Sequence, residues 1–290
     1  MRPGIDDADG FLTARAQFGD VTHLAREVEP GFHWIQEPGP DRSSFVESVR
    51  AEPPDWYDPE EPMYVPQNAY LLNGEEGLLF DTLSPASSDE ILDALDSILD
   101  GELDYLVVSH PDVPHAGNAE AILEAHPGAT LVAPRYGNAH ELYHLDDARK
   151  VGEGDGLDLG GFEVAFHEAA FPDAPVHVWM TEQTTGTLFT VDWLGYPHRD
   201  SETLRFPDEF DTDLTVDRLV QFHGRVLFWF QYVDLDAVGE TVERLIDRYD
   251  PATVAPGHGN PVREDPVEVM GMTRAVAERV RREGRVGTLG

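Results

Sequence analysis

Hydrophobic and polar residues recur along the chain with two different periods, which together predict a mixed α/β fold. Short apolar runs bounded by turn residues predict strands, at residues 32–35, 68–74, 77–82, 105–108, 129–133, 176–179, 187–191 and 253–256. Apolar residues spaced three or four positions apart predict helices, at residues 90–99, 118–123, 137–148, 216–222, 235–249 and 266–283. Because the two kinds of element interleave, we expect two mixed sheets with helices outside them.

Local signals refine this pattern. A glycine-containing turn between 68–74 and 77–82 predicts a hairpin. Ser88 and Asp89 precede the helix at 90–99 and are its candidate caps. The stretch 151–166 alternates between apolar and polar residues and contains glycine turns.

The length of 290 residues fits one large domain or two small ones. We assign residues 1–60 to an N-terminal extension that packs on the core, and residues 61–290 to the main domain. No apolar run is long enough for a transmembrane helix, and the N-terminus lacks the apolar centre of a signal peptide. We therefore expect a cytoplasmic protein.

The chain is strongly acidic, with a formal net charge of -36 from 56 acidic and 20 basic residues. A disordered acidic chain would lack its content of 41% hydrophobic and 10% aromatic residues. The charge indicates a folded protein of an organism adapted to high salt, where a Debye length of roughly 3 Å screens the acidic groups from one another. It also argues against nucleic acid and anionic membranes as partners, because both require a basic surface.

This interpretation predicts a salt-dependent fold. Lowering the salt concentration below about 0.5 M lengthens the Debye length beyond roughly 4 Å and restores repulsion among the acidic groups. We expect the melting temperature to fall between molar and low KCl. Melting curves that coincide at the two concentrations would contradict the prediction.

The strongest candidate chemistry lies at residues 109–118, between the predicted strand 105–108 and the next helix. His110, Asp112 and His115 supply two imidazoles and a carboxylate, the ligands that Zn²⁺ and Fe²⁺ prefer. Strand ends are also where open α/β sheets bind ligands. The chain has no cysteine, which excludes disulfides, thiolate nucleophiles and cysteine-bound metal sites. The simpler alternative is that these histidines only form hydrogen bonds within the loop.

Four segments, taken in order, resemble the metallo-β-lactamase superfamily, and most closely the lactamase-type domain of the flavodiiron proteins. They are NAYL at 68–71 with LFDT at 79–82, YLVVSHPDVPHAGN at 105–118, LFTVDWLG at 188–195 and APGHG at 255–259. The resemblance implies that residues 61–290 form a four-layered αββα sandwich with a two-metal site at one end of the strands. It carries no indication of a flavodoxin domain in this chain.

The resemblance also implies a set of metal ligands. His110 and Asp112 would bind one metal ion, His115 and His258 the other, and Asp192 would bridge the two. As alternatives, Asp192 and His258 could be ordinary turn residues.

The chain departs from the family pattern at two ligand positions. Pro114 stands where the family has an aspartate, and Ala170 stands where it has a histidine. Possible substitutes, or residues that support the ligands, are His167, Asp173, His177, His198 and Asp81.

Three functions remain open on these grounds. The first is a domain with one or two iron ions that reduces or senses O₂ or NO, with a separate flavoprotein or another electron donor and no FMN in this chain. The second is a zinc hydrolase of an ester, thioester or lactone. The third is a degenerate member that binds a partner without catalysis. The sequence does not indicate an oligomeric state.

Overall fold

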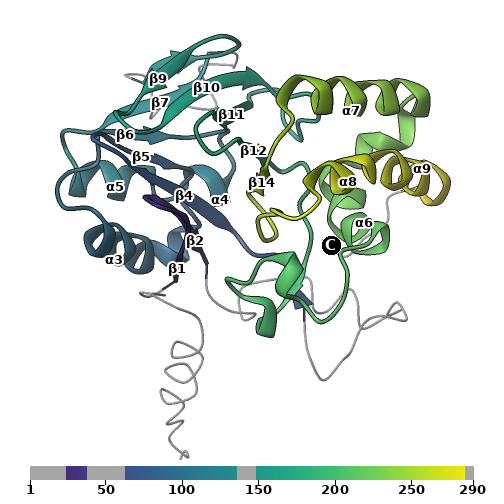
Figure 1. The fold of residues 1–290 in the computed structure, drawn as a ribbon, viewed down its shortest axis with the longest axis horizontal. Helices are drawn as coiled ribbons and strands as arrows, with labels where there is room; N and C mark the ends of the chain where they lie inside the picture. The colour runs from purple at the N-terminus through teal and green to yellow at the C-terminus, as the bar shows by residue number, and fades with distance from the viewer. Residues whose placement is uncertain (1–23, 38–62, 136–147, 285–290) are drawn as a thin grey trace, which may run out of the picture.

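The computed structural model describes residues 24–37, 63–135 and 148–284. Within these residues two large sheets lie face to face, with α3 and α5 outside one sheet and α6, α7 and α9 outside the other (Figure 1). This is the expected four-layered αββα arrangement. The helix expected at 137–148 and most of the N-terminal extension at 1–60 lie outside the described residues.

The first sheet has seven strands in the order β1-β2-β4-β5-β6-β7-β8. Its strands from β1 to β5 pair antiparallel, and those from β5 to β8 pair parallel, so the sheet is mixed as expected. The strands are Ala25–Glu29, Phe32–Gln36, Asn68–Asn73, Gly77–Phe80, Tyr105–Val107, Thr130–Pro134 and Arg149–Val151.

The second sheet has five strands in the order β14-β12-β11-β10-β9, of which only β12 and β14 pair parallel. In chain order the strands are β9 Gly156–Asp158, β10 Glu163–Glu168, β11 Val178–Glu182, β12 Thr187–Val191 and β14 Thr253–Pro256. A separate two-stranded ladder pairs β3, Met63–Tyr64, with β13, His198–Arg199.

The core explains why the strand segments read as continuous apolar runs. In β4, Tyr70 and Leu72 point into the space between the sheets, where they join the second sheet's Phe189. The alternate residues Ala69 and Leu71 lie in a second cluster with residues of α3 and α5. Because successive side chains of a strand point to opposite faces, a strand buried on both faces needs apolar residues at almost every position.

The helices follow the predicted pattern with two differences. They are α3 Ser88–Ile98, α4 Val113–Ala116, α5 Ala119–Ala125, α6 Val216–Val226, α7 Leu235–Tyr249, α8 Pro266–Gly271 and α9 Thr273–Glu283. Short 3₁₀ segments are η2 Pro85–Ser87, η4 Asp200–Glu202, η5 Pro207–Glu209 and η6 Phe228–Tyr232.

The differences concern helix ends. The helix expected at 266–283 is two helices that meet at Met272, whose N–H contacts both the Glu268 and Val269 carbonyls. Gly271 just before it is a poor helix former, which favours the break. Ser88 and Asp89 lie inside α3 instead of capping it, because η2 runs directly into the helix.

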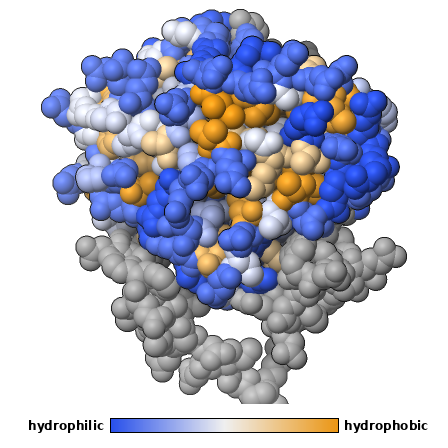
Figure 2. Space-filling view, turned by 45° about the vertical axis from the view of Figure 1, so that its right-hand side comes forward, coloured by the Kyte–Doolittle hydropathy of each residue, from blue (hydrophilic) through white to orange (hydrophobic). Residues whose placement is uncertain are grey.

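Figure 2 shows that hydrophilic residues cover most of the side of the molecule that it presents, with small hydrophobic areas between them. In the described part of the chain, the exposed large apolar side chains are Val113, Phe228, Tyr232 and Val267. None of the described helices combines the length and the apolar character needed to cross a membrane.

Candidate metal centre

The ends of strands from both sheets meet at one place. The Gly257 N–H, after β14, donates to the Val191 carbonyl at the end of β12 at 2.6 Å. Across the sheets, the Asn68 N–H at the start of β4 donates to the Gly257 carbonyl at 2.9 Å. Gly257 must be a glycine here, because a Cβ atom would lie 2.7 Å from Cε1 of His115. The loops after β6, β12 and β14 are therefore held together at this edge.

A first group of possible ligands consists of His110, Asp173, His177 and Asp192, whose donor atoms all lie within 4.8 Å of one another. His110 Nε2 lies 3.5 Å from Asp192 Oδ2 and 3.6 Å from Asp173 Oδ2. The His177 ring stacks on the His110 ring at 4.6 Å between centroids. The Val178 N–H donates to the Ser109 carbonyl at 3.0 Å, which explains why His177 lies beside His110.

Aromatic contacts hold Asp173 in this group. Its neighbour Phe171 packs against Trp193 and Phe230. The Trp229 indole N–H donates to the Pro172 carbonyl at 3.0 Å. The loop before β11 is therefore anchored on η6, and the Asp173 carboxylate faces His110.

A second group consists of His115, His258 and the same Asp192. His258 Nε2 lies 3.5 Å from Asp192 Oδ1, and His115 Nε2 lies 3.9 Å from Asp192 Oδ2. Two imidazoles and one carboxylate are the ligand set of non-haem Fe(II) sites that keep open positions. Asp192 thus belongs to both groups, which is the geometry of a bridging carboxylate.

The four histidines of the two groups each contact a protein group through Nδ1. The Nε2 atoms of His110, His115 and His258 lie within 3.9 Å of an Asp192 carboxylate oxygen, and Nε2 of His177 is buried. The Nδ1 contacts are His110 with Ser109 Oγ at 3.2 Å, His115 with Asp81 at 2.7 Å, His177 with Asp173 at 3.0 Å and His258 with the Pro66 carbonyl at 2.8 Å. Such contacts fix the ring and the tautomer of a metal-binding histidine.

Several buried polar atoms of the site lack a hydrogen-bond partner, which favours a bound cation. The side-chain atoms Nε2 of His110, Nε2 of His177 and Oδ2 of Asp192 are buried and have no hydrogen-bond partner among the described residues. Buried polar atoms normally have partners, so unpaired nitrogen and oxygen atoms within one ligand group suit a bound ion.

The pKa values agree with this. Burial raises the pKa of Asp192 to about 8. Burial alone would lower the pKa of His110, but the nearby carboxylates, with Asp192 first, raise it to about 9. Burial lowers the pKa of His258 to about 3 and also lowers that of His115 and His177, which keeps these rings neutral and able to bind metal. The donor set therefore fits one or two divalent ions such as Fe²⁺ or Zn²⁺.

Asp81 supports the second group without belonging to it. Its buried carboxylate contacts His115 Nδ1 and accepts hydrogen bonds from the Ser109 N–H and hydroxyl group at 2.8 Å and 3.0 Å. Asp81 therefore orients His115, in line with the supporting role considered for it.

Asp112 lies at the mouth of the site. Its side chain is 60% exposed, and Oδ2 lies 3.8 Å from His110 Nε2. Neither ligand group includes it. Its assignment as a ligand of the first metal ion stays a prediction, whereas Asp173 and His177 occupy the space beside His110.

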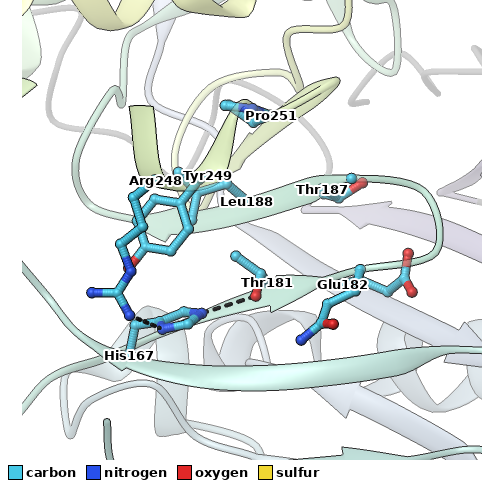
Figure 3. Close-up of a pocket in the computed structure, with 10 residues that line it drawn as sticks. His167, Thr181, Glu182, Thr187, Leu188, Arg248, Tyr249 and Pro251 are labelled. Carbon is cyan, nitrogen blue, oxygen red and sulfur yellow. Dashed lines mark hydrogen bonds between the residues drawn. The ribbon is translucent and has the colours of Figure 1, made fainter. Parts of the chain in front are cut away.

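The structure separates the proposed substitutes. Asp173 and His177 lie in the first group, but His167 does not. His167 lines a different cavity, of about 300 Å³. There Nε2 lies 2.9 Å from Thr181 Oγ1 and Nδ1 lies 3.4 Å from the Arg248 guanidinium, and Figure 3 shows these residues around the cavity. His198 is also outside both groups, buried against the Tyr64 ring at 4.5 Å.

The sequence reasoning missed one buried residue next to the site. His223 of α6 accepts a hydrogen bond at Nε2 from the Leu194 N–H at 3.0 Å, two residues after Asp192. The sequence offered no signal for it, because a single histidine in an amphipathic helix is not distinctive.

The class of the protein follows from this fold and sequence comparison. Residues 63–258 match the metallo-beta-lactamase superfamily, and the chain belongs to that superfamily. The resemblance to this superfamily and to the flavodiiron proteins is therefore confirmed.

Individual relatives show which members of the superfamily the chain resembles. The chain is similar to a nitric oxide reductase of Moorella thermoacetica, with 28% identity over 211 residues, which are 70% of this chain and 51% of the relative. The fold is similar to rubredoxin oxygen:oxidoreductase from Desulfovibrio gigas, with a TM-score of 0.71, 23% identity, and coverage of 88% of this chain and 62% of that chain. It is also similar to the flavodiiron protein from Giardia intestinalis, with a TM-score of 0.68, 18% identity, and coverage of 89% and 59%. The chain spans about half the length of the curated relative.

Proposed function

We propose that this chain binds two redox-active metal ions, most suitably iron, and reduces O₂ or NO with electrons from a separate flavoprotein or another donor. The first ion would be held by His110, Asp173 and His177, the second by His115 and His258, and Asp192 would serve both. One observation carries the proposal, namely that the imidazoles of His110, His115 and His258 direct Nε2 toward one shared buried carboxylate, that of Asp192.

The relatives support the redox chemistry over the alternatives. One similar protein is named a nitric oxide reductase, and another, similar in fold, is an oxygen oxidoreductase. Two ferrous ions with open positions would supply electrons and binding positions for a diatomic gas. The three-residue second group leaves more open positions than the four-residue first group, and Pro114 offers no ligand beside it.

The residues around the site do the remaining work. The Phe222 ring lies 5.0 Å from the His258 ring and helps to exclude water from that side. Asp112, exposed at the mouth and 3.8 Å from His110 Nε2, links the buried groups to solvent and is placed to pass protons inward. A small uncharged gas needs only a narrow opening, whereas an ester or lactone needs room for its acyl group.

The proposal is tested with the metal-loaded protein. We expect purified protein, freed of metal and loaded anaerobically with Fe²⁺, to consume O₂ and to convert NO to N₂O, with two ferrous ions oxidised per N₂O. Protein loaded with Zn²⁺ should do neither, because zinc has no accessible redox change. His258→Ala, loaded in the same way, should lose the activity.

The same preparations test the other functions. Hydrolysis of esters, thioesters or lactones by the Zn²⁺ form, together with no gas consumption by the Fe²⁺ form, would overturn the proposal in favour of a hydrolase. A protein that binds neither metal would instead be a non-catalytic member of the superfamily.

A further inference from the structure

The backbone that presents Asp192 is strained on both sides. Val191 and Leu194 have φ values of 56° and 69°, in the left-handed region that non-glycine residues rarely adopt. For a β-branched residue such as Val191 this conformation is particularly unfavourable. Such a turn persists only where the surrounding structure holds it in place.

Within the turn, the Gly195 N–H donates to the Asp192 carbonyl at 3.2 Å, and the Thr190 hydroxyl donates to the Trp193 carbonyl at 2.6 Å. From outside, the Gly257 N–H holds the Val191 carbonyl at 2.6 Å. Whereas these bonds all end on backbone carbonyls, the Leu194 N–H donates to a side chain, the Nε2 atom of His223 at 3.0 Å.

His223 is well suited to be a fixed acceptor. It is 1% exposed, and its Nδ1 lies 2.8 Å from the Leu219 carbonyl. Because a carbonyl can only accept, Nδ1 must carry the proton, and Nε2 is left as the acceptor for the Leu194 N–H. Burial lowers the pKa of His223 to about 4, so the ring stays neutral.

The neighbouring residue of α6 contacts the other end of the same ligand group. The Phe222 ring lies 5.0 Å from the His258 ring. It also fills the space beside Gly195, where a Cβ atom would lie 2.5 Å from Phe222 Cε1. Two consecutive residues of one helix therefore contact both the Asp192 turn and His258.

We propose that His223 is a positioning residue of the metal centre, which holds the Asp192 carboxylate in its shared position through the Leu194 N–H. This inference rests on the metal-binding part of the proposed function and not on the reaction with a gas. Residues that orient metal ligands without binding the metal lower the metal affinity by about 10–100-fold when they are replaced.

The test compares variants that keep or lose the acceptor. In His223→Gln the amide oxygen can take the place of Nε2 and accept from Leu194. In His223→Asn the shorter side chain reaches only as far as Nδ1, and in His223→Met there is no comparable acceptor. Each variant is titrated with Co²⁺ after metal removal, and both the dissociation constants and the visible absorption bands are measured.

We expect His223→Asn and His223→Met to weaken Co²⁺ binding about 10–100-fold and to shift the absorption bands, whereas His223→Gln stays close to wild type. His126→Gln is the matched control, because His126 Nδ1 also accepts from a backbone N–H, that of Leu103 at 3.3 Å. This control should lower the melting temperature of the metal-free protein without changing cobalt affinity. If His223→Asn does not fold, His223→Met gives the same comparison.

Two results would overturn the inference. Unchanged cobalt affinity and spectra in the variants without an acceptor would show that His223 only fills space, while the metal site itself would stand. A wild-type protein that binds no cobalt would remove both this inference and the proposed function.

Discussion

Replacing Asp192 by asparagine is expected to remove both bound metal ions. Asp192 is the one residue that both ligand groups share, and a neutral amide oxygen is a much poorer ligand for these ions than a carboxylate. Loss of a supporting residue already costs about 10–100-fold in metal affinity, so loss of a shared ligand should exceed about 100-fold at each position. The metal content after equilibrium dialysis, measured by elemental analysis, checks this.

The same change should alter the pH dependence of the stability of the metal-free protein. Burial raises the pKa of Asp192 to about 8, well above the ordinary value of about 3.9 in an unfolded chain. A carboxyl group with a raised pKa in the folded state destabilises the fold increasingly as the pH rises between these two values. Asparagine has no such charge, and it also removes the carboxylate that most raises the pKa of His110. The melting temperature of metal-free Asp192→Asn should therefore depend less on pH between about 4 and 8 than that of metal-free wild type.

Two variants serve as controls for Asp192→Asn. Asp173→Asn should affect only the first ion, because Asp173 belongs to one group. Asp112→Asn tests the ligand that the family resemblance implies: both ions should stay in place if Asp173 and His177 hold the first ion, since the Asp112 side chain lies outside both groups. If Asp192→Asn kept two equivalents of metal, the two groups would not share a bridging carboxylate, and the proposed centre would be wrong.

Where periodicity and end signals agreed, the sequence predicted the fold closely. α7 at Leu235–Tyr249 and β14 at Thr253–Pro256 have the expected bounds. For α7, Asp234 caps the first turn by accepting hydrogen bonds from the Asp236 and Ala237 N–H groups. Elements without such signals were missed, among them β1 and the short pair β3 and β13. Pairs as short as β3 and β13 depend on a partner distant in the chain, and no local pattern marks them.

The residues of the candidate site also differ in whether a local sequence signal marks them. His110, Asp192 and His258 each lie within three residues of the end of a strand, and parallel pairing brings the ends of β12 and β14 together. The sequence could not choose among His167, His177 and His198, because the choice depends on which face or loop each occupies. His167 lies opposite Trp179 in the β10–β11 pair, on the face that packs against α7, where Tyr249 contacts its ring. His177 precedes β11 and is drawn to His110 by the Val178–Ser109 hydrogen bond.

The different positions of His167 and His177 allow a matched pair of alanine substitutions. His177→Ala should lower the metal content from two ions to one, because the first group loses one of its two imidazoles while His115 and His258 remain. His167→Ala should keep both ions, although His167 is closer in sequence than His177 to the position that Ala170 occupies. Its loss removes contacts with Thr181, Arg248, Glu153 and Tyr249, none of which belongs to either ligand group. The readouts are the metal content and the visible spectrum of the Co²⁺ form.

The pair also tests how the chain compensates for Pro114 and Ala170. If Asp173 and His177 replace the missing ligands, the double variant Asp173→Ala/His177→Ala should bind a single ion at the second group, with His258→Ala removing that one. The affinity of this remaining ion should fall more steeply as the pH is lowered than in wild type, because without a cation at the first group protons compete more effectively with the remaining ion for the Asp192 carboxylate. If His167→Ala lost metal and His177→Ala kept it, the ligand set of the first group would have to be redrawn around β10.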